Sequence, residues 1–131
     1  MNVMYHNRSR LSPDLEKACG ARYVDRDTLL KESDHIILVM PYTPENHHLF
    51  GEKELSLMKP TATLINIARG GIVDELALAK ALKEKRIFAA GIDVFEGEPT
   101  VRPELLALSN VVLSPHIASA TEKTRRAMIE L

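Results

Sequence analysis

The chain has 131 residues, of which 45% are hydrophobic and 27% charged, and its formal net charge at pH 7 is −1. This composition is typical of one globular domain, and the small net charge gives no general attraction to nucleic acid or acidic membranes. The single cysteine, Cys19, excludes an intramolecular disulfide and a thiolate metal cluster. No apolar run approaches the roughly 20 residues of a membrane span, and the N-terminus lacks the order of a signal peptide. We therefore expect a cytoplasmic protein with no nucleic-acid or membrane partner.

Short apolar runs alternate with helical patterns along the chain. Because this alternation is typical of β-α units, it predicts an α/β fold with a doubly wound parallel sheet. The runs are rich in Val, Ile and Leu, which predicts strands that are buried on both faces. The predicted strands are residues 3–5, 35–40, 62–67, 88–92 and 111–113.

Helical signals occupy the segments between these strands. Residues 74–85 give the clearest helix, because Leu76, Ala79 and Leu82 are spaced to lie on one face. The other predicted helices start at Ser12 and Pro13, cover residues 27–31, lie within 46–58, and run from 119 to 131, whereas 96–103 is predicted to be a loop.

Three polar side chains each follow a predicted strand: Arg69 within residues 66–71, Glu98 within 91–99 and His116 within 114–119. A guanidinium can clamp a carboxylate through two parallel hydrogen bonds. A histidine titrates near neutral pH and can give or take a hydroxyl proton, while a neighbouring carboxylate fixes its tautomer. Since ligands bind at the carboxyl ends of parallel strands, we predict that the three side chains form one site for reducing a 2-keto acid.

With the run Met-Pro-Tyr-Thr-Pro at 40–44, these motifs resemble the D-isomer-specific 2-hydroxyacid dehydrogenases, especially the glyoxylate and hydroxypyruvate reductase branch. The resemblance extends in order over residues 1–131. It implies that Arg69 binds the substrate carboxylate and carbonyl, that His116 is the acid/base, and that Glu98 is its partner. The cofactor contacts that it implies are Pro41 and Thr43 beside the ribose, the backbone at Ile67 and Ala68 near the nicotinamide, and Asp93 near the nicotinamide.

The usual Gly-rich phosphate loop is absent from the sequence. None of the glycines at 20, 51, 70, 71, 91 and 97 gives the spacing G-x-G-x-x-G that follows the first strand of a dinucleotide-binding fold. Residues 1–6 instead resemble the second strand of such a fold. We therefore interpret residues 1–131 as a partial, Rossmann-like dinucleotide-binding domain without its first β-α unit, whose last helix leads back toward an absent substrate domain. We expect this chain alone to be inactive.

The run Asn7-Arg8-Ser9-Arg10 bears on the choice of cofactor. In the fold suggested, the end of the second strand meets the adenine ribose, where an acidic residue would accept hydrogen bonds from the 2'-hydroxyl. Arg8, Ser9 and Arg10 stand there instead and can surround a 2'-phosphate with charge-assisted donors. This predicts that NADP(H) is preferred and NAD(H) possible; the alternative is a basic turn that faces water.

The predicted function is the NADPH-dependent reduction of glyoxylate- or hydroxypyruvate-type 2-keto acids by a parent protein that we expect to be a homodimer. A phosphoglycerate dehydrogenase-like enzyme is an alternative, although it should have an acidic residue in place of Arg8 or Ser9. A second alternative is a non-catalytic, NAD(H)-sensing module of the corepressor type.

Adjacent histidines, His47 and His48, suggest a metal site. However, neighbouring residues on a helix point about 100 degrees apart, and no acidic or cysteine partner lies at ligand spacing. No metal site is therefore predicted.

Overall fold

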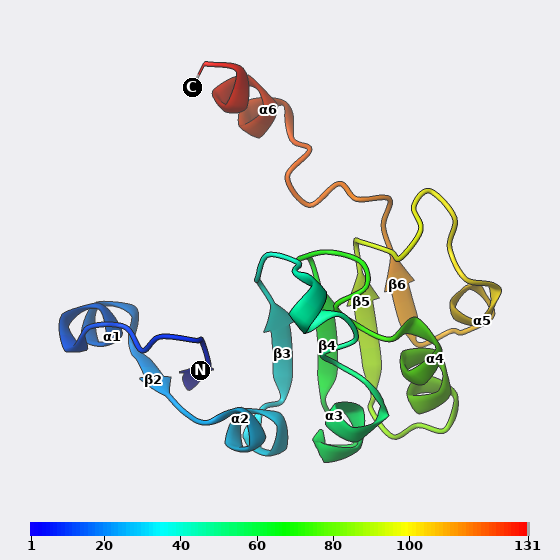
Figure 1. Cartoon of the computed structure of the whole chain (residues 1–131), viewed down its shortest axis with the longest axis horizontal. Helices are drawn as coiled ribbons and strands as arrows, with labels where there is room; N and C mark the ends of the chain where they lie inside the picture. Colours follow the sequence, from blue (N-terminus) through cyan, green and yellow to red (C-terminus); the bar gives the residue numbers. More distant parts are fainter. Residues whose placement is uncertain (131) are drawn as a thin grey trace.

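A computed structural model describes residues 1–130 and contains two parallel sheets. The smaller sheet pairs β1 (Val3–Tyr5) with β2 (Ala21–Tyr23). The larger sheet has the order β3-β4-β5-β6, and Figure 1 shows its strands side by side with their arrows pointing the same way. Its strands are β3 (His35–Leu38), β4 (Thr63–Asn66), β5 (Ala89–Ile92) and β6 (Val111–Leu113). The predicted parallel α/β fold is confirmed.

The two sheets are separated between β1 and β3, which share no ladder of hydrogen bonds among the described residues. In a doubly wound fold the strand order is 3-2-1-4-5-6, so the strand before the Gly-rich loop lies between the second and the fourth. The order β2-β1 followed by β3-β4-β5-β6 matches this sequence of strands without its first member. The separation therefore falls where the fold class would place the β-α unit that residues 1–130 do not contain.

Helices connect most of the strands, and α1 begins at the Ser12-Pro13 pair that the sequence predicted as a helix start. Ser12 accepts a hydrogen bond from the backbone N–H of Leu15, and Pro13 is the first helical residue. No helix of the described residues is long and apolar enough to cross a membrane. The helices are α1 (Pro13–Cys19), α2 (Arg26–Glu32), the 3-10 helix η1 (Pro44–Asn46), α3 (Glu52–Leu57), α4 (Glu75–Lys83), α5 (Pro103–Leu106) and α6 (Glu122–Ile129).

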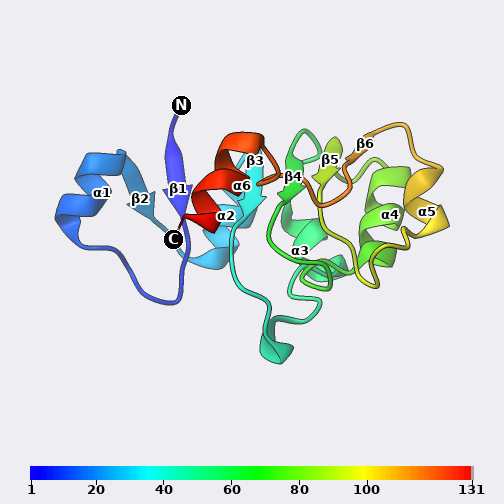
Figure 2. The ribbon, with the colours of Figure 1, turned by 90° about the horizontal axis from the view of Figure 1, so that it is seen from above.

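The core lies on one face of the larger sheet. Figure 2 shows α3 and α4 together on the same side of β3 to β6, and side chains such as Leu64 of β4 and Leu78 of α4 are fully buried there. On the opposite face, Ile37 of β3 is 58% exposed and Val112 of β6 is 73% exposed. The prediction that the strands are buried on both faces is therefore wrong for the described residues, because the core helices cover only one side.

The helix predicted within residues 46–58 is present as α3, which begins at Glu52, after Phe50 makes a parallel bridge with Val73. Two other predicted helices differ from the observed ones. The last helix starts at Glu122, after Thr121 caps it, and Leu131, to which the prediction extended, lies outside the described residues. On α4 the buried positions are Glu75, Leu78, Ala79, Ala81 and Leu82, whereas Leu76 is 49% exposed.

Three short elements were not predicted: η1, β2 and α5. β2 has three residues, Ala-Arg-Tyr, and contains no apolar run that would mark it in the sequence. α5 has four residues and begins at Pro103, the last residue of the segment 96–103 that was predicted to be a loop. All three elements are too short to show a periodicity.

Gly70 allows the turn after β4 to pack against the segment that follows β5. A Cβ atom at position 70 would lie 2.6 Å from the backbone nitrogen of Glu96 and still closer to the carbonyl of Phe95. Only glycine fits such a close approach between two backbones. The contact holds the two segments in register at the carboxyl edge of the sheet.

We expect the substitution Gly70→Ala to lower the free energy of unfolding by about 1–3 kcal/mol, because the added methyl group overpacks against backbone that cannot rotate away. Urea denaturation of the two chains measures the difference. Gly91→Ala is the matched control, since a Cβ at that strand position would lie at an ordinary 3.9 Å from Ile65 Cγ1. Equal stabilities of the Gly70→Ala variant and the parent chain would contradict the close-approach argument.

Candidate active site

Arg69, Glu98 and His116 line one open cleft of about 860 Å³ at the carboxyl edge of the larger sheet. They follow β4, β5 and β6, whose ends are level because Asn66 pairs with Ile92 and Ile92 with Leu113. The structure thus brings together the three side chains that the sequence singled out, while their chemical roles stay predictions. The other lining residues are Val39, Met40, Pro41, Tyr42, Ile67, Ala68, Gly70 and Phe95.

His116 and Glu98 are hydrogen-bonded to each other. His116 Nδ1 lies 2.9 Å from Glu98 Oε2, and Glu98 Oε1 accepts a hydrogen bond from the backbone N–H of Phe95 at 2.8 Å. The hydrogen bond from His116 and then that from Phe95 lower the pKa of Glu98 below its ordinary value. An ionised carboxylate can only accept hydrogen bonds. Nδ1 of His116 must therefore carry a proton, which leaves Nε2 available to a ligand.

Asp93 holds the loop on which His116 lies. Its side chain is buried and accepts hydrogen bonds from Ser114 Oγ at 2.6 Å and from the backbone N–H groups of Ile117 and Ala118 at 2.9 and 2.8 Å. Burial alone would raise the pKa of Asp93, but these hydrogen bonds outweigh burial and lower the pKa. Asp93 is not among the residues that line the cleft. The contacts that it makes are with the His116 loop, which has a left-handed backbone at His116 with φ of 53°.

Arg69 lies at the surface of the cleft, on a turn fixed by Asn66. The buried Asn66 side chain accepts from the backbone N–H of Ala68 at 3.1 Å and donates to the carbonyl of Arg69 at 3.2 Å. Arg69 Nη1 donates to the carbonyl of Ala68 at 2.7 Å, and within residues 1–130 no carboxylate pairs with the guanidinium. Most of its donors are therefore free for an anion. Sequence reasoning missed Asn66, although a polar residue at the end of an apolar strand was a usable signal.

Glu75, at the start of α4, supports the loop that carries Glu98. Its side chain is 3% exposed; Oε1 accepts from the backbone N–H of Glu96 at 2.7 Å, and Oε2 lies 3.4 Å from Nε of Arg102. Burial raises the pKa of Glu75, although the Glu96 N–H and the charge of Arg102 act in the opposite direction. Oε2 has no hydrogen-bond partner. Burying a carboxylate that lacks a hydrogen bond on one oxygen costs free energy. Its hydrogen bond to Glu96 fixes the position of the loop that carries Glu98.

Only some of the predicted cofactor residues lie in the cleft. Pro41, Ile67 and Ala68 line it together with the three polar side chains. Thr43 does not line it; its backbone N–H donates to Asn46 Oδ1 at 2.8 Å at the start of η1. Asp93, after β5, lies beneath the His116 loop and does not line the cleft, and Arg8, Ser9 and Arg10 lie outside the cleft, after β1.

The basic run after β1 is exposed, and its two arginines differ. Arg10 donates to both carboxylate oxygens of Glu16 at 2.8 Å, and this contact, with a hydrogen bond from Tyr5, lowers the pKa of Glu16 to about 2. Arg8 makes no ion pair with any described residue, and Ser9 is exposed. Arg8 is therefore the guanidinium that remains available to an anion at this corner of the fold.

A parallel sheet of this order, with a cleft at the carboxyl ends of its strands, is the architecture of a doubly wound dinucleotide-binding domain. The family described as "D-isomer specific 2-hydroxyacid dehydrogenase, NAD binding domain" matches residues 1–118. The chain belongs to this family.

The sequence is also similar to named reductases. The chain is 56% identical to a glyoxylate reductase of Thermococcus litoralis over 131 residues, which are 100% of this chain and 39% of that protein. It is 50% identical over 129 residues to glyoxylate/hydroxypyruvate reductase B of Shigella boydii, covering 98% of this chain and 40% of the relative. The chain thus spans about two fifths of the length of these relatives.

Solved structures agree with this assignment. A glyoxylate reductase from Paecilomyes thermophila superimposes with a TM-score of 0.93 at 43% identity, over 100% of this chain and 39% of that one. An NADPH-dependent glyoxylate/hydroxypyruvate reductase from Sinorhizobium meliloti, in complex with NADP and malonate, gives a TM-score of 0.89 at 37% identity, over 98% and 39% of the two chains. These comparisons confirm the predicted family and the Rossmann-like, NAD-binding fold class.

We expect Asp93→Asn to lower the free energy of unfolding by about 1–3 kcal/mol, because an amide cannot accept all three hydrogen bonds of the buried carboxylate. The pKa of Asp93 is lowered in the folded chain. The stabilisation is therefore present above the unfolded pKa of about 3.9 and is lost as the pH falls through the folded pKa. Urea denaturation between neutral and acidic pH measures both effects.

Asp34→Asn is the matched control for this measurement. Asp34 is 72% exposed and pairs with Lys59 at the surface, where an ion pair contributes about 0–1 kcal/mol. An Asp93→Asn variant that is as stable as the Asp34→Asn variant at neutral pH would contradict the role given to Asp93.

Proposed function

We propose that residues 1–131 form the cofactor-binding and proton-transferring part of an NADPH-dependent reductase of small 2-keto acids such as glyoxylate or hydroxypyruvate. The observation that carries the proposal is the cleft in which Arg69 lies with the hydrogen-bonded pair of Glu98 and His116. The relatives named glyoxylate reductase support it. Because the chain covers 39% of such a relative, the activity is proposed for a protein that also supplies the rest of the cleft.

Each polar side chain has a role that its geometry allows. The free donors of Arg69 bind the substrate carboxylate through two hydrogen bonds and orient its keto group. His116 holds a proton on Nε2 and passes it to the keto oxygen, while Glu98 keeps the ring in place through Nδ1 and stabilises the imidazolium. A nicotinamide cofactor would supply the hydride when bound.

Residues of this chain fit that cofactor at two places. Pro41, Ile67 and Ala68 form a wall of the cleft where the nicotinamide end would lie. Arg8, with Ser9 beside it, offers an unpaired guanidinium for the 2'-phosphate of NADP(H). The bound NADP of the Sinorhizobium meliloti relative supports this choice. We infer a preference for NADP(H), with NAD(H) also accepted, in a cytoplasmic homodimer.

A chimera tests the activity. Residues 1–131 replace the matching stretch of the Thermococcus litoralis glyoxylate reductase, with which they align over their full length, and glyoxylate reduction is followed by NADPH oxidation. We expect His116→Asn to reduce kcat/KM by about 100- to 10,000-fold, the usual contribution of general acid-base catalysis. Asparagine is chosen because it tolerates the left-handed backbone of position 116.

His35→Asn is the matched control, since His35 is an exposed histidine of β3 that contacts Thr63 and not the cleft. A folded chimera whose His116→Asn variant retains full activity would refute the role of His116. A folded chimera that binds NADH but turns over no substrate would support the sensing alternative.

In the same chimera we expect Arg8→Glu to lower the affinity for NADPH by roughly 10- to 150-fold, the equivalent of about 1.5–3 kcal/mol for a charge-assisted contact. NADH binding should change far less, because NADH carries no 2'-phosphate. Arg22→Glu is the matched control, an exposed arginine of β2 that pairs with Glu32 at 3.5 Å. Equal losses for NADPH and NADH in the Arg8→Glu variant would contradict the assignment.

A further inference from the structure

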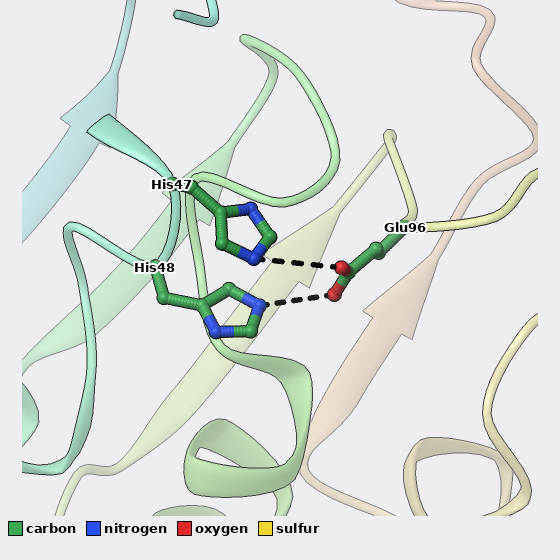
Figure 3. Close-up of side chains that lie close together, drawn as sticks. All are labelled: His47, His48 and Glu96. Carbon is green, nitrogen blue, oxygen red and sulfur yellow. Dashed lines mark hydrogen bonds and ion pairs between the residues drawn. The ribbon is translucent and has the colours of Figure 1, made fainter. Parts of the chain in front are cut away.

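His47, His48 and Glu96 form a cluster that the reaction described above does not use. The two imidazole rings are stacked, with centroids 3.8 Å apart and planes inclined by 22°. His48 Nε2 lies 3.0 Å from Glu96 Oε2, and His47 Nε2 lies 3.8 Å from Glu96 Oε1. Figure 3 shows both Nε2 atoms directed at the same carboxylate. Two nitrogen ligands and one oxygen ligand are thus gathered within 4.8 Å of one another.

The local backbone explains why two adjacent histidines face the same way. The pair lies between two helices and in neither of them, because η1 ends at Asn46 and α3 begins at Glu52. His48 has a left-handed backbone with φ of 52°, and its N–H donates to the carbonyl of Gly71 at 2.7 Å. The helical geometry that argued against a shared ligand therefore does not apply, and the acidic partner comes from the loop after β5.

The second ring nitrogen of His47 has a hydrogen-bond partner, because Nδ1 lies 3.2 Å from the hydroxyl of Tyr42. His48 Nδ1 lies 3.9 Å from Asp74 Oδ2, which is too far for a hydrogen bond but places a carboxylate on that side of the ring. Metal-binding histidines usually have such partners on the other ring nitrogen, which fix the tautomer and the ring orientation. This arrangement leaves both Nε2 atoms as the nitrogens that face Glu96.

Charge and distance also favour a cation. Two imidazole nitrogens and one carboxylate oxygen are a donor set for a divalent transition metal. Ligand atoms around a tetrahedral zinc ion lie roughly 3.4 Å apart, given metal-ligand distances of about 2.0–2.2 Å. The observed 3.0 and 3.8 Å lie on either side of that value. The nearest competing cation, Arg102, is 4.0 Å from Glu96 Oε2.

We propose that His47, His48 and Glu96 bind one Zn²⁺ ion beside the cleft, with at least one open coordination position. The side chains are 41%, 36% and 33% exposed, so the ion can reach them from solvent. Tyr42 lines the cleft, and Glu96 lies next to the cleft residue Phe95. The ion would therefore join the segment before α3 to the loop after β5, which are two walls of the cleft.

Isothermal titration calorimetry of the untagged chain with zinc chloride tests the proposal. Cys19→Ser serves as the parent, because Cys19 is an exposed free thiol that could bind zinc itself. We expect one equivalent of zinc to bind, and we expect His47→Ala, His48→Asn and Glu96→Gln each to weaken binding by at least about tenfold. Tyr42→Phe should weaken it by about 10- to 100-fold, as loss of a partner behind a ligand does.

Two controls distinguish zinc binding at this site from zinc binding at other histidines and from non-specific attraction of a divalent cation. His35→Ala should bind zinc like the parent, since His35 is exposed and remote from the cluster. Magnesium chloride should produce no saturable heat, because Mg²⁺ prefers oxygen ligands. As a second measurement, zinc should raise the Tm of the parent and of His35→Ala but not that of Glu96→Gln. The proposal is overturned if the parent binds no zinc, or if His47→Ala or Glu96→Gln binds zinc as tightly as the parent.

Discussion

The register of three neighbouring strands is the constraint on which the candidate site depends. Asn66, Ile92 and Leu113 lie level at the ends of β4, β5 and β6, so the segments that leave these strands start at one edge of the sheet. Arg69, Glu98 and His116 lie three to six residues further on, within reach of each other only because that edge is shared. In a parallel sheet a shift of one residue would reverse the faces of a strand. The alternation of buried and more exposed residues along each strand fixes its register, and thereby the position of the polar side chain that follows it.

Buried polar groups then convert this approximate convergence into a defined geometry. Asn66 shapes the turn that presents Arg69, Asp93 fixes the loop of His116, and Glu75 holds the backbone at Glu96. Each of these groups is almost fully buried, so each would be costly without its hydrogen bonds. All three bind backbone groups of the loops at the cleft. The positions of Arg69, Glu98 and His116 are thus fixed by buried hydrogen bonds to the backbone of the loops that carry them.

The sequence predicted the parallel α/β fold and the convergence of Arg69, Glu98 and His116, because strand patterns and strand ends are local properties. It did not predict the role of Glu75. This residue precedes Leu78, Ala79 and Leu82 at helical spacing on the buried face but is charged, so Leu76 was assigned to that face in its place. Nor could it predict the cluster of His47 and His48 with Glu96, which lies 48 residues away from His48 and meets it only in the folded chain. Tertiary packing decides both features, and neither leaves a periodic pattern.

The separation of the two sheets has a consequence for how local stability is distributed. Nothing in β1, α1 or β2 is fully buried, whereas β4 and α4 carry side chains with no exposed surface. Segments that bury little apolar surface open at a lower free energy than the core does. Arg8, which we propose as the contact to the cofactor's 2'-phosphate, therefore belongs to the more easily opened part. Arg69, Glu98 and His116 follow strands of the more protected part. A cofactor that contacts both parts would slow amide hydrogen exchange mainly in residues 1–23, where the free chain has the least protection to begin with.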